Sequence, residues 1–151
     1  MIDITNPNNL KIPKHSEFEL WVHTILSYLN LSQIYICCHI ANTTEIQKLN
    51  STFRSKNTPT NVLSFPYDKP PGLPEHELQG FIGDIIICPE VIEREAINYG
   101  KSPEDHWAHI TIHGVLHLLG YDHINDYDAE IMENIEINIL KQFNIKNPYR
   151  D

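Results

Sequence analysis

The sequence has few cysteines and few basic residues. Its three cysteines are an odd number, and Cys37 and Cys38 are adjacent, so a disulfide framework is not expected. A reducing compartment, the cytoplasm, fits this cysteine usage best. Only 11 Lys and Arg stand against 20 Asp and Glu, which gives a formal net charge of −9. This balance disfavours a broad nucleic-acid-binding surface, because phosphate affinity depends on clustered positive charge, but it permits a local basic site.

The sequence also has no long hydrophobic run, and a secretory leader is not expected. No stretch reaches the roughly 18 uninterrupted apolar residues of a membrane-spanning helix. The first residues, MIDITNPNNL, have neither the basic start nor the apolar run of a signal peptide. We therefore expect a cytoplasmic protein that makes no use of a membrane. The 151 residues are 41% hydrophobic and 21% charged, which suits one globular domain over residues 1–151.

Periodicity and turn signals predict a fold of the α+β class. Strands are expected at 1–5, 34–40, 62–67 and 81–88, and helices at 16–30, 44–49, 89–100, from 102 and from about 125. The helix starts carry capping signals, namely Ser16 with Glu19, Thr44 with Gln47, and Ser102. The proline-rich stretch 68–79 is expected to be a surface loop. The predicted architecture is a small mixed β-sheet of about four strands packed with about five helices.

The strongest chemical signal is the segment HITIHGVLHLLGYDH at residues 109–123. His113 and His117 are four apart, so on a helix they lie about 6 Å apart along the axis and about 40° around it, and both imidazoles can face one ion. Gly120 allows the helix to stop, and the chain can then return His123 from another direction. Three imidazoles leave a fourth position for water, which is typical of a catalytic zinc site.

Two neighbouring histidines are expected to have roles other than metal binding. His109 and His113 form an alternative pair at the same spacing, but His109 and His117 are about 12 Å apart along a helix and cannot share one ion. His109 is therefore interpreted as a group that lines the cleft or supports a ligand. A lone histidine such as His106 is most often structural. The spacing also leaves the metal open, since imidazole suits nickel, copper and iron as well as zinc.

The same spacing occurs in the metzincin proteases, with one difference. Those enzymes have a glutamate directly after the first histidine as general base, and here that position is Gly114. A peptidase of the standard mechanism is therefore disfavoured. Asp122 is expected to orient a ligand imidazole. Asp84 is expected to pair with backbone or with a ligand histidine, and Ser64 is expected to be structural.

Four blocks in order resemble the YbeY family of bacterial endoribonucleases. They are LNSTFR at 49–54, PTNVLSFP at 59–66, GDIIIC at 83–88 and HGVLHLLGYDH at 113–123, and together they cover roughly residues 45 to 130. The resemblance implies a zinc-dependent, single-strand-specific endoribonuclease that matures the 3′ end of 16S rRNA and takes part in ribosome quality control. It implies one Zn²⁺ held by His113, His117 and His123, with Arg54 as the functional basic residue. The implied partners are an rRNA precursor and ribosomal proteins.

The chemistry expected of this site is RNA cleavage. Zinc lowers the pKa of bound water to about 7, and the guanidinium of Arg54 can bind phosphate bidentately. Attack by the neighbouring 2′-hydroxyl remains an alternative that the product ends would distinguish. Three rival functions are a ribosome-assembly factor with a structural zinc, a metallopeptidase and a small-molecule metallohydrolase. Three ligands rather than four weigh against the first of these, and Gly114 against the second.

Overall fold

The computed structural model describes residues 1–68 and 80–149. Along the chain the described elements are β1 (Ile2–Thr5), α1 (His15–Leu29), β2 (Tyr35–Ile40), α2 (Thr43–Arg54), β3 (Val62–Pro66), β4 (Phe81–Ile87), α3 (Pro89–Tyr99), α4 (Pro103–Leu118) and α5 (Asp126–Lys141). The predicted α+β class, with a mixed sheet and helices packed on it, is confirmed. The loop expected at 68–79 lies outside the described residues except for Asp68.

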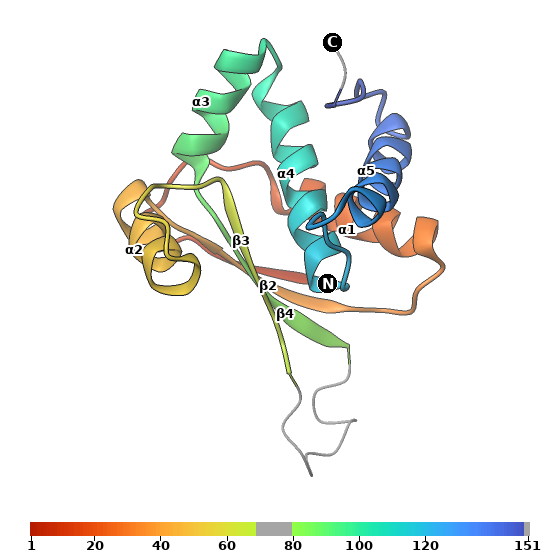
Figure 1. Ribbon diagram of the computed structural model, residues 1–151, viewed down its shortest axis with the longest axis horizontal. Helices are drawn as coiled ribbons and strands as arrows, with labels where there is room; N and C mark the ends of the chain where they lie inside the picture. Colours follow the sequence, from red (N-terminus) through yellow and green to blue (C-terminus); the bar gives the residue numbers. More distant parts are fainter. Residues whose placement is uncertain (69–79, 150–151) are drawn as a thin grey trace.

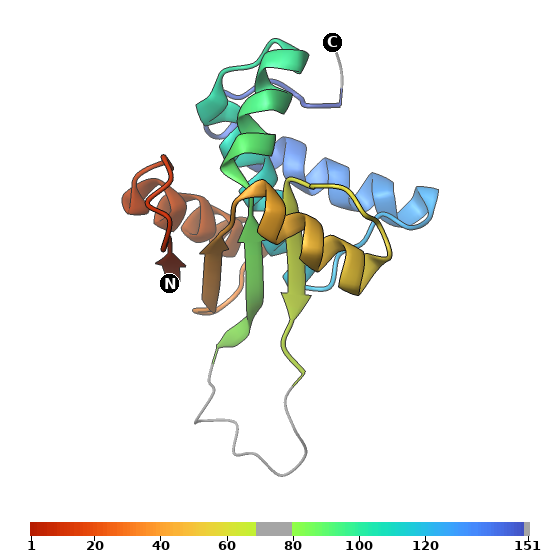
Figure 2. The ribbon, with the colours of Figure 1, turned by 90° about the vertical axis from the view of Figure 1, so that its left-hand side faces the viewer.

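The strands form one mixed sheet in the order β1-β2-β4-β3. β1, β2 and β4 run parallel, and β3 pairs antiparallel with β4, as Figure 2 shows face-on. Ile85 and Ile87 of β4 are fully buried, and β-branched side chains pack well on a pleated surface. The strand β3 lies at one edge of the sheet, and this edge borders the site described below.

Helices cover the two faces of the sheet unequally. Figure 1 shows α1, α4 and α5 on one side of the sheet and α2 on the other. The larger apolar core lies on the side of α4, whereas a smaller cluster around Ile46 and Leu63 packs under α2. No helix among residues 1–68 and 80–149 is both long and apolar enough to cross a membrane.

The helix α4 is the central helix of the larger core. Its apolar side chains are buried nearly all round, as the sequence predicts, and the buried ones are Trp107, Ala108, Ile110, Ile112, Val115, Leu116 and Leu118. Ser102 caps it as expected, because its side chain accepts a hydrogen bond from the backbone N–H of Asp105 at 3.2 Å. This helix therefore gives the histidines that it carries a rigid support.

The capping box predicted at the start of α1 is wrong. Lys14 is the N-cap residue and makes no side-chain capping bond, so Ser16 and Glu19 do not form a capping box. The Glu19 carboxylate instead accepts from the backbone N–H of Ile2 at 3.0 Å. The carboxylate thus satisfies the backbone of β1, which a local motif could not reveal.

The predicted start of α2 is also displaced. The capping box is formed by Asn42 and Glu45 rather than by Thr44 and Gln47, with reciprocal bonds of 2.9 and 3.2 Å. The helix is longer than the expected 44–49 and reaches Arg54 in its last turn. This extra length carries Arg54 to the end of α2 beside β3.

Candidate metal centre

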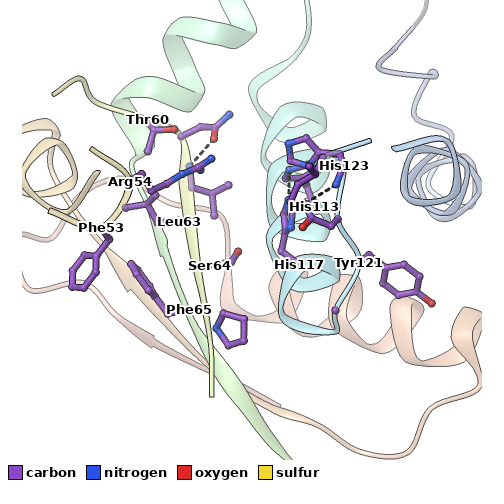
Figure 3. Close-up of a pocket in the computed structure, with 16 residues that line it drawn as sticks. Phe53, Arg54, Thr60, Leu63, Ser64, Phe65, His113, His117, Tyr121 and His123 are labelled. Carbon is purple, nitrogen blue, oxygen red and sulfur yellow. Dashed lines mark hydrogen bonds between the residues drawn. The ribbon is translucent and has the colours of Figure 1, made fainter. Parts of the chain in front are cut away.

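Three histidines converge at the C-terminal end of α4. His113 and His117 lie one turn apart on the helix, and Gly120, with a φ of 101°, then reverses the chain. The backbone N–H of Tyr121 donates to the carbonyl of Leu116 at 3.1 Å, which closes this turn. The reversal returns His123 to the other two imidazoles, as Figure 3 shows. Local helix geometry and one glycine are enough to bring the three residues together.

The three imidazoles lie at distances that suit a shared ion. Their ring centroids are 4.6, 4.9 and 5.4 Å apart, and one nitrogen of each lies within 4.8 Å of the others. The Nε2 atoms of His113 and His117 are 3.1 Å apart. Two nitrogens bound tetrahedrally at zinc distances would be about 3.3 to 3.4 Å apart. The described residues therefore form a cluster that could hold a metal ion.

The protonation of His117 is also suited to metal binding. Burial, then the neighbouring His113 and His123, lowers its pKa from 6.5 to about 4. His117 is therefore neutral at physiological pH, and the neutral imidazole is the form that binds metals.

A buried carboxylate that the sequence reading missed supports this cluster. Glu136 of α5 is fully buried, and its Oε1 atom lies 2.5 Å from Nδ1 of His113. Its Oε2 atom accepts a hydrogen bond from the hydroxyl of Tyr149. Burial and the Glu136 carboxylate raise the pKa of Tyr149, so the hydroxyl stays protonated and donates. A carboxylate at apolar helical spacing from Met132 and Ile139 was the signal that could have revealed it.

His109 lies behind the three converging histidines. Its side chain is only 12% exposed, and its Nε2 atom lies 3.9 Å from Glu136 and 3.3 Å from the Tyr149 hydroxyl. Burial, then Lys101 and His113, lowers the pKa of His109 to about 3. The structure thus places it beside the carboxylate that supports His113. His106, one turn earlier, is buried and pairs with Glu95 at 2.9 Å.

Gly114, at the position of the metzincin glutamate, faces the sheet. A Cβ atom there would lie 3.0 Å from Val62, 3.4 Å from the Ser64 hydroxyl and 3.5 Å from Ile85. The Ser64 hydroxyl donates to the carbonyl of Gly114 at 2.9 Å, so Ser64 joins β3 to α4 in the structural role expected of it. The close approach of α4 to β3 and β4 therefore disfavours a side chain as large as glutamate at position 114.

A cavity of about 870 Å³ lies between β3, the end of α2 and the histidines. His113, His117 and His123 line one wall, and Arg54, Thr60 and Ser64 are among the residues of the opposite wall (Figure 3). Arg54 is exposed, and no ion pair of its guanidinium occurs among the described side chains. The cavity thus brings a free positive charge and the histidine cluster to one space.

The two aspartates expected to assist the site lie elsewhere or act differently. The Asp122 carboxylate accepts from the backbone N–H of His123 at 2.7 Å, so its hydrogen bond stabilises the turn. Asp84 pairs at 3.0 Å with His39, a strand residue outside the cluster, and the expectation that it pairs with a ligand histidine is wrong. Neighbouring residues of a strand point to opposite faces, and because Ile85 faces Gly114 of α4, Asp84 lies on the face away from α4.

Comparisons with known proteins agree on one family. The model of the family Endoribonuclease YbeY matches residues 3–144. The chain belongs to this family. An Endoribonuclease YbeY from Francisella philomiragia is 45% identical over 148 residues, covering 98% of this chain and 94% of the relative. One from Alteromonas mediterranea is 48% identical over 141 residues, covering 93% of this chain and 87% of the relative. The family resemblance read from the four sequence blocks is therefore confirmed.

A solved structure is similar to this fold as a whole. The solution structure of a Thermotoga maritima protein matches with a TM-score of 0.56 at 24% identity, and the match covers 100% of both chains. At this identity the likeness supports the fold alone. The arrangement of sheet and helices thus also occurs in a chain that shares only 24% of its residues with this one.

Proposed function

We propose that this chain is a zinc-dependent, single-strand-specific endoribonuclease that acts in 16S rRNA 3′-end maturation and ribosome quality control. The observation that carries the proposal is the convergence of His113, His117 and His123 on a cavity that Arg54 also lines. The family name supports cleavage of RNA as the reaction class. We further propose that the chain works in the cytoplasm as one hydrolase domain, on an rRNA precursor and with ribosomal proteins.

The proposed zinc ligands are His113, His117 and His123. Three protein nitrogens leave one coordination position open, which is the arrangement of catalytic rather than structural zinc. When bound, zinc supplies a water of lowered pKa and a Lewis acid beside the phosphate. The chain contributes the neutral imidazole of His117, the apolar floor of α4 beneath the histidines and a fixed plane for His113. These features favour zinc over the larger oxygen-seeking cations.

Arg54 is the proposed phosphate-binding residue. Its planar guanidinium can donate two parallel hydrogen bonds to phosphate oxygens and stabilise the charge that develops on them during cleavage. The short segment after α2 holds this end of the helix in place, because the Asn50 side chain donates to the carbonyl of Thr58 at 2.9 Å. A single local guanidinium also suits a protein whose net charge is −9, since this charge balance disfavours a broad basic surface.

The proposed mechanism needs no side-chain base from α4. Gly114 replaces the glutamate of the peptidases, and the buried Glu136 already accepts from His113 and Tyr149. Two routes fit these residues, namely attack by water and attack by the neighbouring 2′-hydroxyl. They give different products, because only the second leaves a 2′,3′-cyclic phosphate. Analysis of the product ends by mass spectrometry separates them.

The test is cleavage of a single-stranded rRNA precursor fragment by zinc-loaded wild type beside His117→Ala, with the same fragment as a duplex for control. We expect cleavage of the single strand by wild type, none by His117→Ala with an unchanged circular dichroism spectrum, and little cleavage of the duplex. Equal activity in wild type and variant would refute the proposal. A zinc-loaded wild type without activity would favour a ribosome-assembly factor instead.

Arg54 is tested separately from the metal. Arg54→Ala should lower the rate of cleavage about 10- to 100-fold, because a charge-assisted bond to the phosphate is lost, while the zinc content stays the same. Arg94→Ala is the matched control, since Arg94 is an exposed arginine of α3 that pairs with Glu90 at 3.5 Å. Similar rates for the two variants would remove Arg54 from the proposed site.

A further inference from the structure

An ionisable side chain lies in the core beside the histidine cluster without a packing reason. Glu136 is 0% exposed, whereas the other core residues of α5 are the apolar Met132, Ile139 and Leu140. Burying a carboxylate costs free energy unless hydrogen bonds and opposite charge compensate it. An apolar residue would dock α5 on α4 without this cost. The carboxylate therefore points to a role other than packing.

Both oxygens of Glu136 have a partner near the site. Oε1 lies 2.5 Å from Nδ1 of His113, and Oε2 accepts from the hydroxyl of Tyr149. The same hydroxyl lies 3.3 Å from Nε2 of His109. Tyr149 follows the end of α5, so the last described residues of the chain return to α4. One connected chain of side chains thus runs from the C-terminal segment to a proposed zinc ligand.

The direction of the first bond determines which nitrogen of His113 is free. A carboxylate only accepts, so Nδ1 of His113 carries the proton and donates a hydrogen bond to Glu136. The lone pair is then on Nε2, and this is the atom that lies 3.1 Å from Nε2 of His117. The bond also restrains rotation of the imidazole ring. Carboxylates in this position are known to orient metal-binding histidines.

We propose that Glu136 and Tyr149 are positioning residues of the metal centre. Glu136 fixes the tautomer and the ring plane of His113, and Tyr149 fixes the carboxylate of Glu136. The C-terminal segment of the chain thereby helps to determine how tightly the ion is held. This inference rests on the proposed metal site, and it does not depend on which RNA, if any, the protein cleaves.

The experiment compares zinc affinity in three purified variants, Glu136→Gln, Tyr149→Phe and Tyr28→Phe. Tyr28→Phe is the matched control, because the Tyr28 hydroxyl also bonds a residue of α5, Asn138, at 2.9 Å but takes no part in the network. Competition with a chromophoric chelator gives the dissociation constant of Zn²⁺. We expect it to rise about 10- to 100-fold in Glu136→Gln and about three- to tenfold in Tyr149→Phe. In Tyr28→Phe it should change less than about twofold.

A second readout separates positioning from general stability. The visible absorption of the Co²⁺-substituted protein reports ligand geometry, and it should shift in Glu136→Gln and Tyr149→Phe but not in Tyr28→Phe. Thermal unfolding of the metal-free proteins checks that each variant is folded. If Glu136→Gln does not fold, Tyr149→Phe carries the test, since it removes only one oxygen atom.

Two results would overturn the inference. The first is an unchanged zinc affinity and cobalt spectrum in both network variants. The second is a wild type with two ions per chain and a Glu136→Gln variant with one, because Glu136, His109 and His113 would then bind a second ion with the atoms that lie within 4.8 Å. A wild type that binds zinc as expected but cleaves no RNA would refute the proposed function and leave this inference intact.

Discussion

Two histidine–carboxylate pairs in this molecule look alike in distance and differ in surroundings. His113 and Glu136 lie 2.5 Å apart, and His39 and Asp84 lie 3.0 Å apart. The first pair is 22% and 0% exposed, whereas the second is 46% and 39% exposed. Water competes for the second pair and screens its charges, so the same contact stabilises it far less. Both pairs lie within hydrogen-bond distance, and burial is the larger difference between them.

The wider surroundings differ in the same sense. Around His113, two further imidazoles converge from α4 and from the turn after Gly120. Around His39 and Asp84, no third His, Cys, Asp or Glu among residues 1–68 and 80–149 completes a group that could hold an ion. The comparison teaches that a metal centre is recognised by convergence of several donors on one point. A single ion pair on a strand is not enough.

The largest effect is expected when the histidine of each pair is removed in turn and zinc binding is compared. His113→Ala should weaken Zn²⁺ binding by at least about 100-fold, because it removes one of three proposed ligands and takes away the partner of Glu136 Oε1. His39→Ala should leave the zinc dissociation constant unchanged. Isothermal titration or chelator competition measures both. Equal losses in the two variants would mean that the buried cluster is not the metal centre.

The next largest effect is expected from a substitution that buries a carboxylate without a histidine partner. Gly114→Glu would put its side chain against Val62 and Ile85 at the contact between α4 and the sheet. We expect the free energy of unfolding to fall by at least about 3 kcal/mol, from overpacking and an unpaired charge. Urea denaturation of the metal-free protein gives the value. A variant as stable as wild type, or one with peptidase activity, would contradict this account of Gly114.

The pH dependence of stability reports on His109, a buried histidine beside the His113–Glu136 pair. His109 has an ordinary pKa of 6.5 when unfolded and one lowered to about 3 in the fold, with burial as the main cause. Between these values the unfolded chain binds a proton that the folded chain does not. The metal-free protein should therefore lose stability as the pH falls from about 6.5 toward 3, by up to about 1.4 kcal/mol per pH unit from this group. His109→Gln should flatten this slope in urea midpoints, and parallel slopes would contradict the prediction.

The smallest expected effect is on the exposed pair. Asp84→Asn removes the charge opposite His39 but leaves both side chains in solvent contact. The free energy of unfolding should change by less than about 0.5 kcal/mol, and the zinc affinity should stay the same. Chemical denaturation and metal titration test the two statements. A large change in either would show that the open face of the sheet is coupled to the metal centre.

The sequence was sufficient where the geometry is local. The four-residue spacing of His113 and His117 is a property of one helix, and the turn at Gly120 needs only the next few residues. The helices, the strands and the α+β class could also be predicted, because hydrophobic periodicity is a local property of the sequence. Arg54 needed the family resemblance, because nothing in its own spacing indicates that α2 extends to the cavity.

Contacts between distant segments could not be read in this way. Glu136 and Tyr149 are 23 and 36 positions beyond His113, and only the packing of α5 and the C-terminal segment on α4 brings them to it. The predicted box at Ser16 failed for a related reason, since Glu19 is taken by the backbone of β1. The pairing of Asp84 with a ligand histidine was predicted wrongly. Side chains of a strand alternate between two faces, and the sequence of β4 does not show which face α4 covers.

The most direct test of the central claim is X-ray absorption spectroscopy of the zinc-loaded protein, with the metal content measured beside it. The account predicts one zinc per chain, with three imidazole nitrogens at about 2.0 to 2.1 Å and one further light atom. His117→Ala should lose the ion. A carboxylate or sulfur ligand, or an ion that persists in His117→Ala, would contradict the claim that these three histidines form the metal centre.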